Sequence, residues 1–295
     1  MPGSLFPDGR DGAARLRHLF EAGSLVVAPG CYDALSARVI ERSGHSAAFI
    51  SGFAVAGSRL GLPDVGLMSY GEALDQARLI CAATSLPVIG DADTGYGNSV
   101  NAQRTLLGFA QAGVACVMVE DQQWPKQCGH TAGKKVVGRA EAVARVRAMV
   151  EARSEHGLDV LIMARTDAVA AESFDEALWR ASAFADEGVD LTFVEAPETR
   201  TQMERYCREV PGWKTANLVE DGQTPWLEPD DLREIGYSLA IYPLSLMLRS
   251  ISAMEVAAER IGRDDETRVK FDHARDVFGW PDYEMRVKRL EGGDV

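Results

Sequence analysis

The sequence predicts an α/β barrel in which eight parallel strands alternate with eight helices. Eight short apolar runs rich in β-branched residues recur along the chain, and each ends in polar residues or glycine. Each run is followed by a stretch with apolar residues three and four positions apart, which is typical of an amphipathic helix. Strands that alternate with helices form parallel sheets, and eight repeats favour closure into a (β/α)8 barrel of the TIM type.

The elements follow one another in a regular order. The apolar, β-branched runs predict strands at 25–28, 47–50, 87–89, 116–119, 160–164, 191–194, 214–217 and 239–242. The helical spacing predicts helices at 34–43, 70–84, 99–112, 139–154, 173–187, 201–210, 228–235 and 244–261.

The whole chain is expected to form one α/β barrel domain, residues 1–295. A doubly wound open sheet is the alternative, but it usually has fewer strands, and no G-x-G-x-x-G motif follows the first strand here. No linker rich in Pro, Ser or Gly interrupts residues 25–261. We expect the barrel at about 20–261 and a polar, partly helical C-terminal extension at about 262–295.

The composition excludes several classes of protein. Of the 295 residues, 46% are hydrophobic and 25% are charged, which rules out disorder for most of the chain. The net charge of −13 repels phosphate backbones, so no nucleic-acid partner is expected, and an anionic substrate needs a local cation or metal. Five dispersed cysteines, and no run of eighteen apolar residues, favour a cytoplasmic protein with no disulfide framework and no membrane partner.

Acidic residues gather at the predicted carboxyl ends of the strands, where barrels of this kind place their active sites. Asp64 lies in the loop after the second strand, Asp91 and Asp93 follow the third, and Glu120 and Asp121 follow the fourth. Asp91 and Asp93 stand two apart on a segment expected to be extended, so both would face the same side. Clustered carboxylates resist ionisation without a cation among them, and oxygen ligands favour Mg²⁺ or Mn²⁺ over Zn²⁺. The alternative is a solvated acidic rim.

A polar segment at 125–130 carries a cysteine in an unusual setting. Cys128 precedes Gly129 and His130, and cationic side chains that include Lys126 and Lys134 stand nearby in the sequence. Such charges lower the pKa of a thiol and favour a reactive thiolate. The other four cysteines are expected to be core residues. No second His stands at ligand spacing from His130, which is therefore expected to tune the loop rather than bind metal.

Arg165 closes an otherwise apolar strand among carboxylates. A guanidinium group there can hold a substrate carboxylate or carbonyl oxygen through two hydrogen bonds. The alternative is a structural ion pair with Asp167 or Glu195, because such networks are common. Spacing alone does not choose between these two interpretations.

Several motifs occur in a specific order: DADTGYGN at 91–98, EDQ at 120–122, KQCGH at 126–130 and ARTDA at 164–168. Shorter matches lie at 33–37, 51–52, 61–64 and 195–197. In this order and spacing, from about Gly30 to Met254, they resemble the isocitrate lyase and phosphoenolpyruvate mutase superfamily. The likeness extends most closely to its 2,3-dimethylmalate lyase, petal-death-protein and 2-methylisocitrate lyase branches.

The resemblance implies a barrel that binds Mg²⁺ at its carboxyl rim, in a homotetramer whose last helix is swapped between neighbouring subunits. Asp93 matches the direct metal ligand, and Asp91, Asp64 and Glu120 match residues that hold waters of the metal ion. Arg165 matches a residue that grips the carboxylate of a 2-oxo or 2-hydroxy acid. The substrate-binding residues are expected to be Ser51, Gly52, Phe53, Asp64, Gly129, His130, Arg165, Glu195 and Asn217.

The cysteine in the KQCGH loop favours a carbon–carbon lyase, because the phosphonate mutases of the superfamily lack it. The expected substrate is a small di- or tricarboxylate, such as a 2-alkylmalate or 2-methylisocitrate, cleaved to a 2-oxo acid and a carboxylate. We expect Cys128 to act as general acid and Arg165 to stabilise the forming carbonyl oxygen. Glu120, Asp64 or a water of the metal remain alternatives for the general base.

Three other functions stay open at the level of sequence. The first is a phosphonate mutase or hydrolase of the same superfamily, similar to carboxyvinyl-carboxyphosphonate phosphorylmutase. The second is an oxaloacetate-cleaving enzyme, and the third is a protein that binds a metabolite without catalysis.

Overall fold

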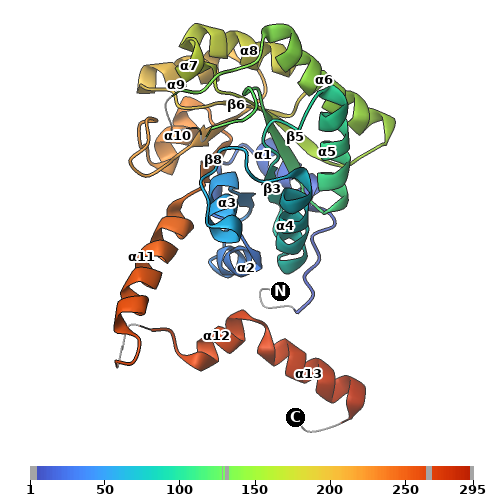
Figure 1. Cartoon of the computed structure of the whole chain (residues 1–295). Coiled ribbons are helices and arrows are strands. Elements are labelled where there is room, and N and C mark those ends of the chain that lie inside the picture. The colour runs from blue at the N-terminus through green and yellow to red at the C-terminus, as the bar shows by residue number, and fades with distance from the viewer. Residues whose placement is uncertain (1–4, 128, 130–132, 264–267, 293–295) are drawn as a thin grey trace.

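The computed structural model describes residues 5–127, 129, 133–263 and 268–292. Its centre is a closed barrel of eight parallel strands in sequence order, with the last strand paired to the first (Figure 1). The predicted barrel is therefore confirmed. The strands are β1 (Val26–Cys31), β2 (Ala48–Ile50), β3 (Val88–Asp91), β4 (Cys116–Glu120), β5 (Leu161–Thr166), β6 (Leu191–Val194), β7 (Trp213–Asn217) and β8 (Leu239–Tyr242).

Eight helices lie where helical spacing predicts them. Asp33, Ser69 and Asn98 begin three of these helices, since each side chain accepts a backbone N–H of the first turn and the third helical residue bonds back. The eight helices are α2 (Ala34–Arg42), α4 (Tyr70–Ala83), α5 (Ser99–Gln111), α6 (Arg139–Glu155), α8 (Phe174–Asp186), α9 (Arg200–Glu209), α10 (Pro229–Ile235) and α11 (Ser245–Arg260).

Part of one predicted loop is a helix. The sequence predicts a loop with Asp64 after the second strand; Asp64 does lie in a loop, but the unpredicted helix α3 (Gly52–Leu60) stands between β2 and that loop. The Ser51 side chain caps it by accepting a hydrogen bond from the backbone N–H of Ala54, and Gly61 ends it at a left-handed φ of 64°. The helix is short, and its small apolar residues follow the apolar run of β2 after a single serine, so the sequence shows little boundary between strand and helix.

Four other helices were not predicted as separate elements: α1 (Gly12–Glu21), α7 (Ala168–Ala171), α12 (Phe271–Val277) and α13 (Trp280–Glu291). Helix α1 closes the amino-terminal end of the barrel. Its Leu16 and Phe20 are buried in the same core cluster as Met118 and Met163, and Phe20 packs on Trp213 with ring centroids 5.0 Å apart. Side chains thus fill the barrel from that end, which leaves the carboxyl end for a cavity.

Helices α11, α12 and α13 lead away from the barrel (Figure 1). The extension touches the rest of the chain through an Arg42–Asp276 ion pair and through the backbone N–H of Leu5, which donates to Asp282 Oδ2 at 2.7 Å. None of the described helices has the length and apolar character needed to cross a membrane.

Replacing Gly30 by alanine is expected to destabilise the barrel. A Cβ at Gly30 would lie 2.2 Å from the backbone oxygen of Pro243, so one of the two segments must move. We expect the free energy of unfolding to fall by about 1–3 kcal/mol, the usual cost of overpacking. Gly57 of α3 is the matched control: a Cβ there meets nothing within 4 Å, and Gly57→Ala is expected to stabilise by about 0.5 kcal/mol or more. Urea unfolding of both variants checks the contrast, and equal stabilities would contradict it.

Candidate active site

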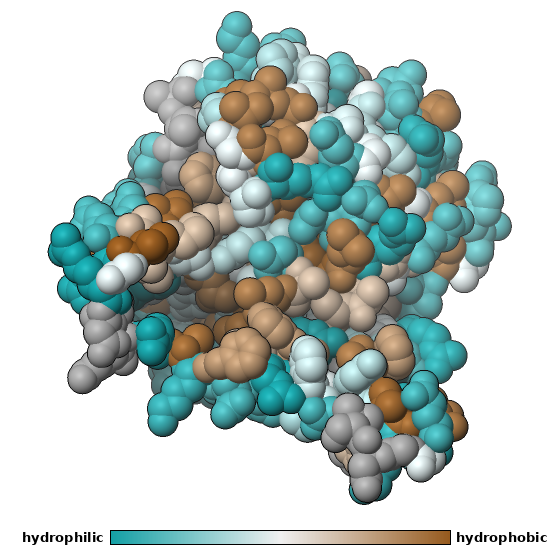
Figure 2. All heavy atoms as spheres, turned by 60° about the horizontal axis from the view of Figure 1, so that its bottom comes forward, coloured by the Kyte–Doolittle hydropathy of each residue, from teal (hydrophilic) through white to brown (hydrophobic). Residues whose placement is uncertain are grey.

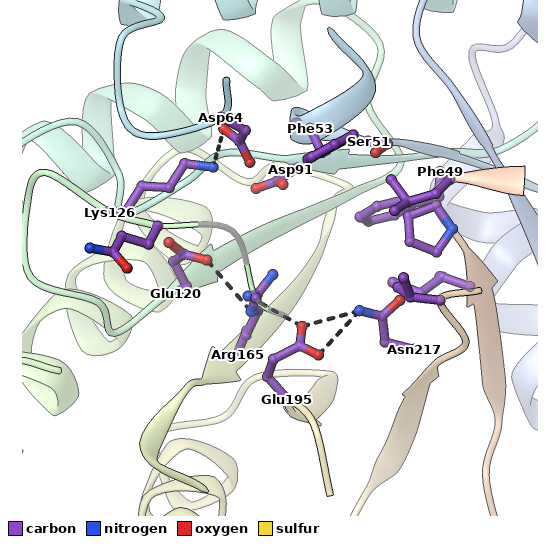
Figure 3. Close-up of a pocket in the computed structure, with 17 residues that line it drawn as sticks. Phe49, Ser51, Phe53, Asp64, Asp91, Glu120, Lys126, Arg165, Glu195 and Asn217 are labelled. Carbon is purple, nitrogen blue, oxygen red and sulfur yellow. Dashed lines mark hydrogen bonds and ion pairs between the residues drawn. The ribbon is translucent and has the colours of Figure 1, made fainter. Parts of the chain in front are cut away.

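A cavity of about 60 Å³ lies at the carboxyl ends of the strands (Figure 3). This volume holds roughly four to six water molecules, which is the size of a small acid. Among its lining residues are Ser51, Gly52, Phe53, Asp64, Asp91, Glu120, Gly129, Arg165, Glu195 and Asn217, all proposed from the sequence. Asp93 is buried beside the cavity but does not line it. Cys128 and His130 lie outside the described residues.

The acidic side chains close around the ammonium group of Lys126. Its Nζ lies 2.5 Å from Asp64 Oδ1 and 2.8 Å from Asp93 Oδ1, and the lysine side chain is only 3% exposed. Burial alone would lower the pKa of Lys126, but the carboxylates of Asp93 and Asp64 raise it well above its usual value. The charge of Lys126 is therefore paired within the acidic cluster, which weakens the expectation that it activates the loop thiol.

Asp91 and Asp93 do not share an extended segment, so that prediction is wrong. Asp93 has a φ of 47°, in the left-handed region that Asp tolerates better than most residues, and its backbone N–H donates to Asp91 Oδ1 at 3.0 Å. The backbone turns directly after β3, which brings Asp93 to Lys126 while Asp91 faces the cavity. Burial and the neighbouring Asp93 raise the pKa of Asp91 to about 6.

The acidic cluster fits a hard divalent cation. Lys126 already stands among its carboxylates as a cation, and the buried Glu120 Oε1 has no hydrogen-bond partner in the described structure. Burial raises the pKa of Glu120 and of Asp64, so a further positive charge would stabilise both as carboxylates. Across the described ranges, no three His, Cys, Asp or Glu side chains form a direct ligand group.

Arg165 is ion-paired with Asp167 and Glu195, as one interpretation of its sequence position expected, and it also lines the cavity. Its contact with a substrate stays a prediction. Its Nε and Nη2 donate to Asp167 at 2.9 and 3.0 Å, and Nη2 lies 3.2 Å from Glu195 Oε2. Burial opposes the charge of Arg165, but Asp167 and Glu195 raise its pKa well above the usual value. Asn217 Nδ2 donates to both oxygens of Glu195, at 3.2 and 3.1 Å (Figure 3). The guanidinium is thus a fixed charge in a fixed orientation.

Ser51 and Gly52 lie where β2 ends and α3 begins. The free N–H groups and the partial positive charge of a helix N-terminus suit a carboxylate. Glycine is required at position 52, because a Cβ there would lie 2.7 Å from Asp91 Oδ2. The unpredicted helix α3 therefore supplies an anion-binding end next to the acidic cluster.

The opposite side of the cavity is apolar. Phe49 lies across from Lys126 and Glu120 in Figure 3, and Phe53 lies beside Ser51 and Asp91 at the edge of the charged side. Val219, Ile241, Pro243 and Leu244 complete this wall. The cavity therefore has a charged half and an apolar half. It can hold a substrate that has a charged group at one end and a hydrocarbon group at the other.

Sequence reasoning missed the pairing of Lys126 and most of the apolar wall. The position of Lys126, the first cation after the strand-end acids Glu120 and Asp121, was the available signal for the pairing. Of the four cysteines expected in the core, Cys31 and Cys116 are buried, whereas Cys81 and Cys207 are only partly buried against its edge. Burial raises the pKa of Cys81 to about 12, so this thiol stays protonated near neutral pH.

The fold and these motifs have known counterparts. A model of the phosphoenolpyruvate phosphomutase family matches residues 16–262. The chain is 40% identical to 2,3-dimethylmalate lyase of Eubacterium barkeri over 273 residues, which covers 90% of this chain and 94% of that protein.

Two solved structures superpose on nearly the whole chain. A structure of oxaloacetate acetylhydrolase with the inhibitor 3,3-difluorooxalacetate has a TM-score of 0.91 and 31% identity, and it covers 97% of this chain and 99% of that chain. A crystal structure of 2,3-dimethylmalate lyase has a TM-score of 0.90 and 33% identity, and it covers 97% of both chains. The chain thus belongs to the phosphoenolpyruvate mutase and isocitrate lyase superfamily.

Proposed function

We propose that this protein is a carbon–carbon lyase that uses a divalent cation, Mg²⁺ in the first instance, to cleave a 2-alkylmalate-type 2-hydroxy dicarboxylate. The products are a 2-oxo acid and a second carboxylate. The observation that carries the proposal is a cavity lined by Arg165 and the acidic cluster on one side and by apolar residues such as Phe49 on the other. Similarity to 2,3-dimethylmalate lyase supports it.

The charged half of the cavity binds the acid end of the substrate. We assign the substrate carboxylate to the N-terminus of α3 at Ser51 and Gly52, and the 2-oxygen to Arg165. Asp93 directly, and Asp64, Asp91 and Glu120 through water, are the residues that would hold the cation. When bound, the cation supplies electrostatic stabilisation of negative charge on a substrate oxygen.

The bond changes then follow from the positions of the side chains. Glu120 is assigned to accept the proton of the 2-hydroxyl group, because it lines the cavity with an oxygen that has no hydrogen-bond partner in the described structure. The oxygen's electron pair forms the new carbonyl, which Arg165 stabilises, and the bond between carbons 2 and 3 breaks. Its electrons stay on carbon 3, which takes a proton from the thiol assigned by the sequence, Cys128.

The apolar half of the cavity favours an alkyl substituent over a further carboxylate. Lys126 and Arg165 are the cations among the described lining residues, and both are already ion-paired. A tricarboxylate such as 2-methylisocitrate would place its third charge against Phe49, Phe53 or Leu244, where the described lining residues offer no unpaired cation. An alkyl group at the same place buries hydrocarbon surface, and each methylene changes kcat/KM by about tenfold or more.

A panel of 2-hydroxy diacids tests the proposal. With Mg²⁺ present, release of a 2-oxo acid, measured through lactate dehydrogenase, is expected to be fastest with 2-alkylmalates and slower with malate or 2-methylisocitrate. Oxaloacetate and phosphonopyruvate belong in the same panel, because related proteins act on oxaloacetate or carry the phosphomutase name. Preferred turnover of either compound would replace the lyase proposal.

We also propose that the protein is a homotetramer in which the C-terminal helices are exchanged between neighbours. Helices α11, α12 and α13 expose large apolar side chains that an isolated chain would leave in water. Apolar atoms are visible on this side of the molecule in Figure 2. The exposed residues are Ile251, Met254, Val256, Ile261, Phe271, Phe278, Trp280, Met285 and Leu290. Burial of such a surface against other copies supports assembly.

Removing the extension after residue 262 is expected to dissociate the tetramer. Light scattering after size-exclusion chromatography should give the mass of four chains for the full protein and a smaller assembly for the truncated one. A full-length protein with the mass of one chain would contradict the proposed assembly.

A further inference from the structure

Lys134 carries a buried ammonium group next to the cavity. Its side chain is 1% exposed, and Nζ donates to Asp167 Oδ1 at 2.8 Å and to the backbone oxygen of Gly129. Lys134 is not among the residues that line the cavity. Burial of an unpaired charge destabilises a protein, so the two partners of Lys134 identify the groups that it holds in place.

The first partner, Asp167, is shared with Arg165. Asp167 Oδ1 accepts from both Lys134 Nζ and Arg165 Nη2, while Oδ2 accepts from Arg165 Nε. The backbone at Asp167 is also held, because its N–H donates to Asp121 Oδ1 at 3.0 Å. Lys134 thereby holds Asp167 Oδ1, the oxygen that accepts the hydrogen bond from Arg165 Nη2.

The second partner, Gly129, lies directly against the Arg165–Glu195 ion pair. A Cβ at Gly129 would be 2.5 Å from Arg165 Nη2 and 2.7 Å from Glu195 Oε2. The backbone therefore approaches the guanidinium as closely as it can, and the bond from Lys134 keeps it there. Both bonds of Lys134 thus act on the surroundings of the same Arg165 nitrogen.

We propose that Lys134 is a positioning residue for the reaction, which fixes Arg165 through Asp167 and Gly129. The inference rests on the proposed function, since it is Arg165 that faces the reacting oxygen. Small displacements of such a group cost a large factor in rate, because its donors must meet charge that develops only as the bond breaks. A loss of Lys134 should therefore lower kcat more than it raises KM.

The variants Lys134→Met and Lys135→Met make a matched pair. Lys135 is exposed and does not line the cavity. We expect Lys134→Met to lower kcat by about 10- to 100-fold, as losses of supporting residues commonly do, while Lys135→Met leaves it unchanged. Lys134→Arg keeps a cation at this position and should recover much of the loss, which also covers the case in which Lys134→Met does not fold.

A double-mutant cycle with Asp167→Asn separates positioning from a general loss of stability. If Lys134 acts in part through Asp167, the loss in the double variant should be clearly smaller than the sum of the two single losses. The affinity for oxalate, measured by calorimetry with Mg²⁺ present, gives a readout that needs no turnover. We expect the affinity for oxalate to fall about tenfold in Lys134→Met, because Arg165 would shift away from the position in which it contacts the ligand.

The outcomes distinguish the two proposals. Unchanged kcat and oxalate affinity in Lys134→Met, or fully additive losses with Asp167→Asn, would overturn the role of Lys134 while the lyase activity of the wild type stands. A wild-type protein that neither binds oxalate nor releases a 2-oxo acid from any diacid would overturn the proposed function, and this inference with it.

Discussion

Replacing Arg165 by glutamine is expected to lower kcat/KM for the preferred diacid by roughly 10³-fold, the loss typical of a donor that stabilises an oxyanion. The guanidinium is held by Asp167 and Glu195 at 2.9 to 3.2 Å, so its donors are fixed before the substrate arrives. Glutamine keeps one donor but loses the charge and the second hydrogen bond. Steady-state kinetics across the diacid panel measure the effect.

Stability must be measured beside activity in the Arg165 variant. Its removal leaves the buried carboxylates of Asp167 and Glu195 without their shared cation, and breaking such a pair costs about 3–5 kcal/mol. Arg147 is a suitable control, because it is 55% exposed and pairs with Glu187 at 2.7 Å on the surface. Arg147→Gln is expected to cost about 0–1 kcal/mol and to leave turnover unchanged. A folded Arg165→Gln with wild-type turnover would remove Arg165 from the mechanism.

Replacing Cys128 by alanine is expected to lower kcat by about 10²- to 10⁴-fold, the range for loss of a general acid. The assignment comes from the KQCGH motif, in which this cysteine distinguishes lyases from phosphonate mutases. Because the thiol is assigned to proton transfer and not to binding, the affinities for Mg²⁺ and for oxalate should remain at wild-type values. Calorimetry and single-turnover kinetics separate these quantities.

Cys207 provides the control for Cys128. It lies at the end of α9, burial raises its pKa to about 12, and it is remote from the lining of the cavity. Cys207→Ala should keep full turnover. Near-wild-type cleavage by Cys128→Ala would leave the carbanion without its assigned acid.

The barrel was predictable from sequence because local patterns determine it. The apolar runs and the helical spacing of eight repeats locate every strand and eight of the helices within a few residues. Helix α3 was missed because its short apolar sequence continues the apolar run of β2 with almost no polar break. Helix α1 was missed because its place at the end of the barrel depends on packing against Trp213. Tertiary contacts of that kind leave little trace in a local pattern.

The sequence predicted most of the residues of the candidate site, but it predicted less of their arrangement in space. Strand ends supply Asp91, Glu120 and Arg165, so their position on the barrel brings them to the cavity. Other features depend on contacts between residues far apart in the sequence. They are the left-handed turn at Asp93 and the pairing of Lys126 and Lys134 with carboxylates. Sequence neighbours suggested that these lysines serve the thiol, whereas in the folded chain Lys126 is paired with Asp64 and Asp93, and Lys134 with Asp167.

The claim on which the account depends is that the acidic cluster around Asp93 needs a divalent cation for cleavage. It is tested most directly by the rate of 2-oxo acid release from a 2-alkylmalate after the protein is stripped with a chelator and then titrated with Mg²⁺. We expect the stripped protein to be inactive and the rate to return along a saturable curve, with higher Mg²⁺ required by Asp93→Asn. A stripped protein that cleaves the substrate at its full rate would contradict the account.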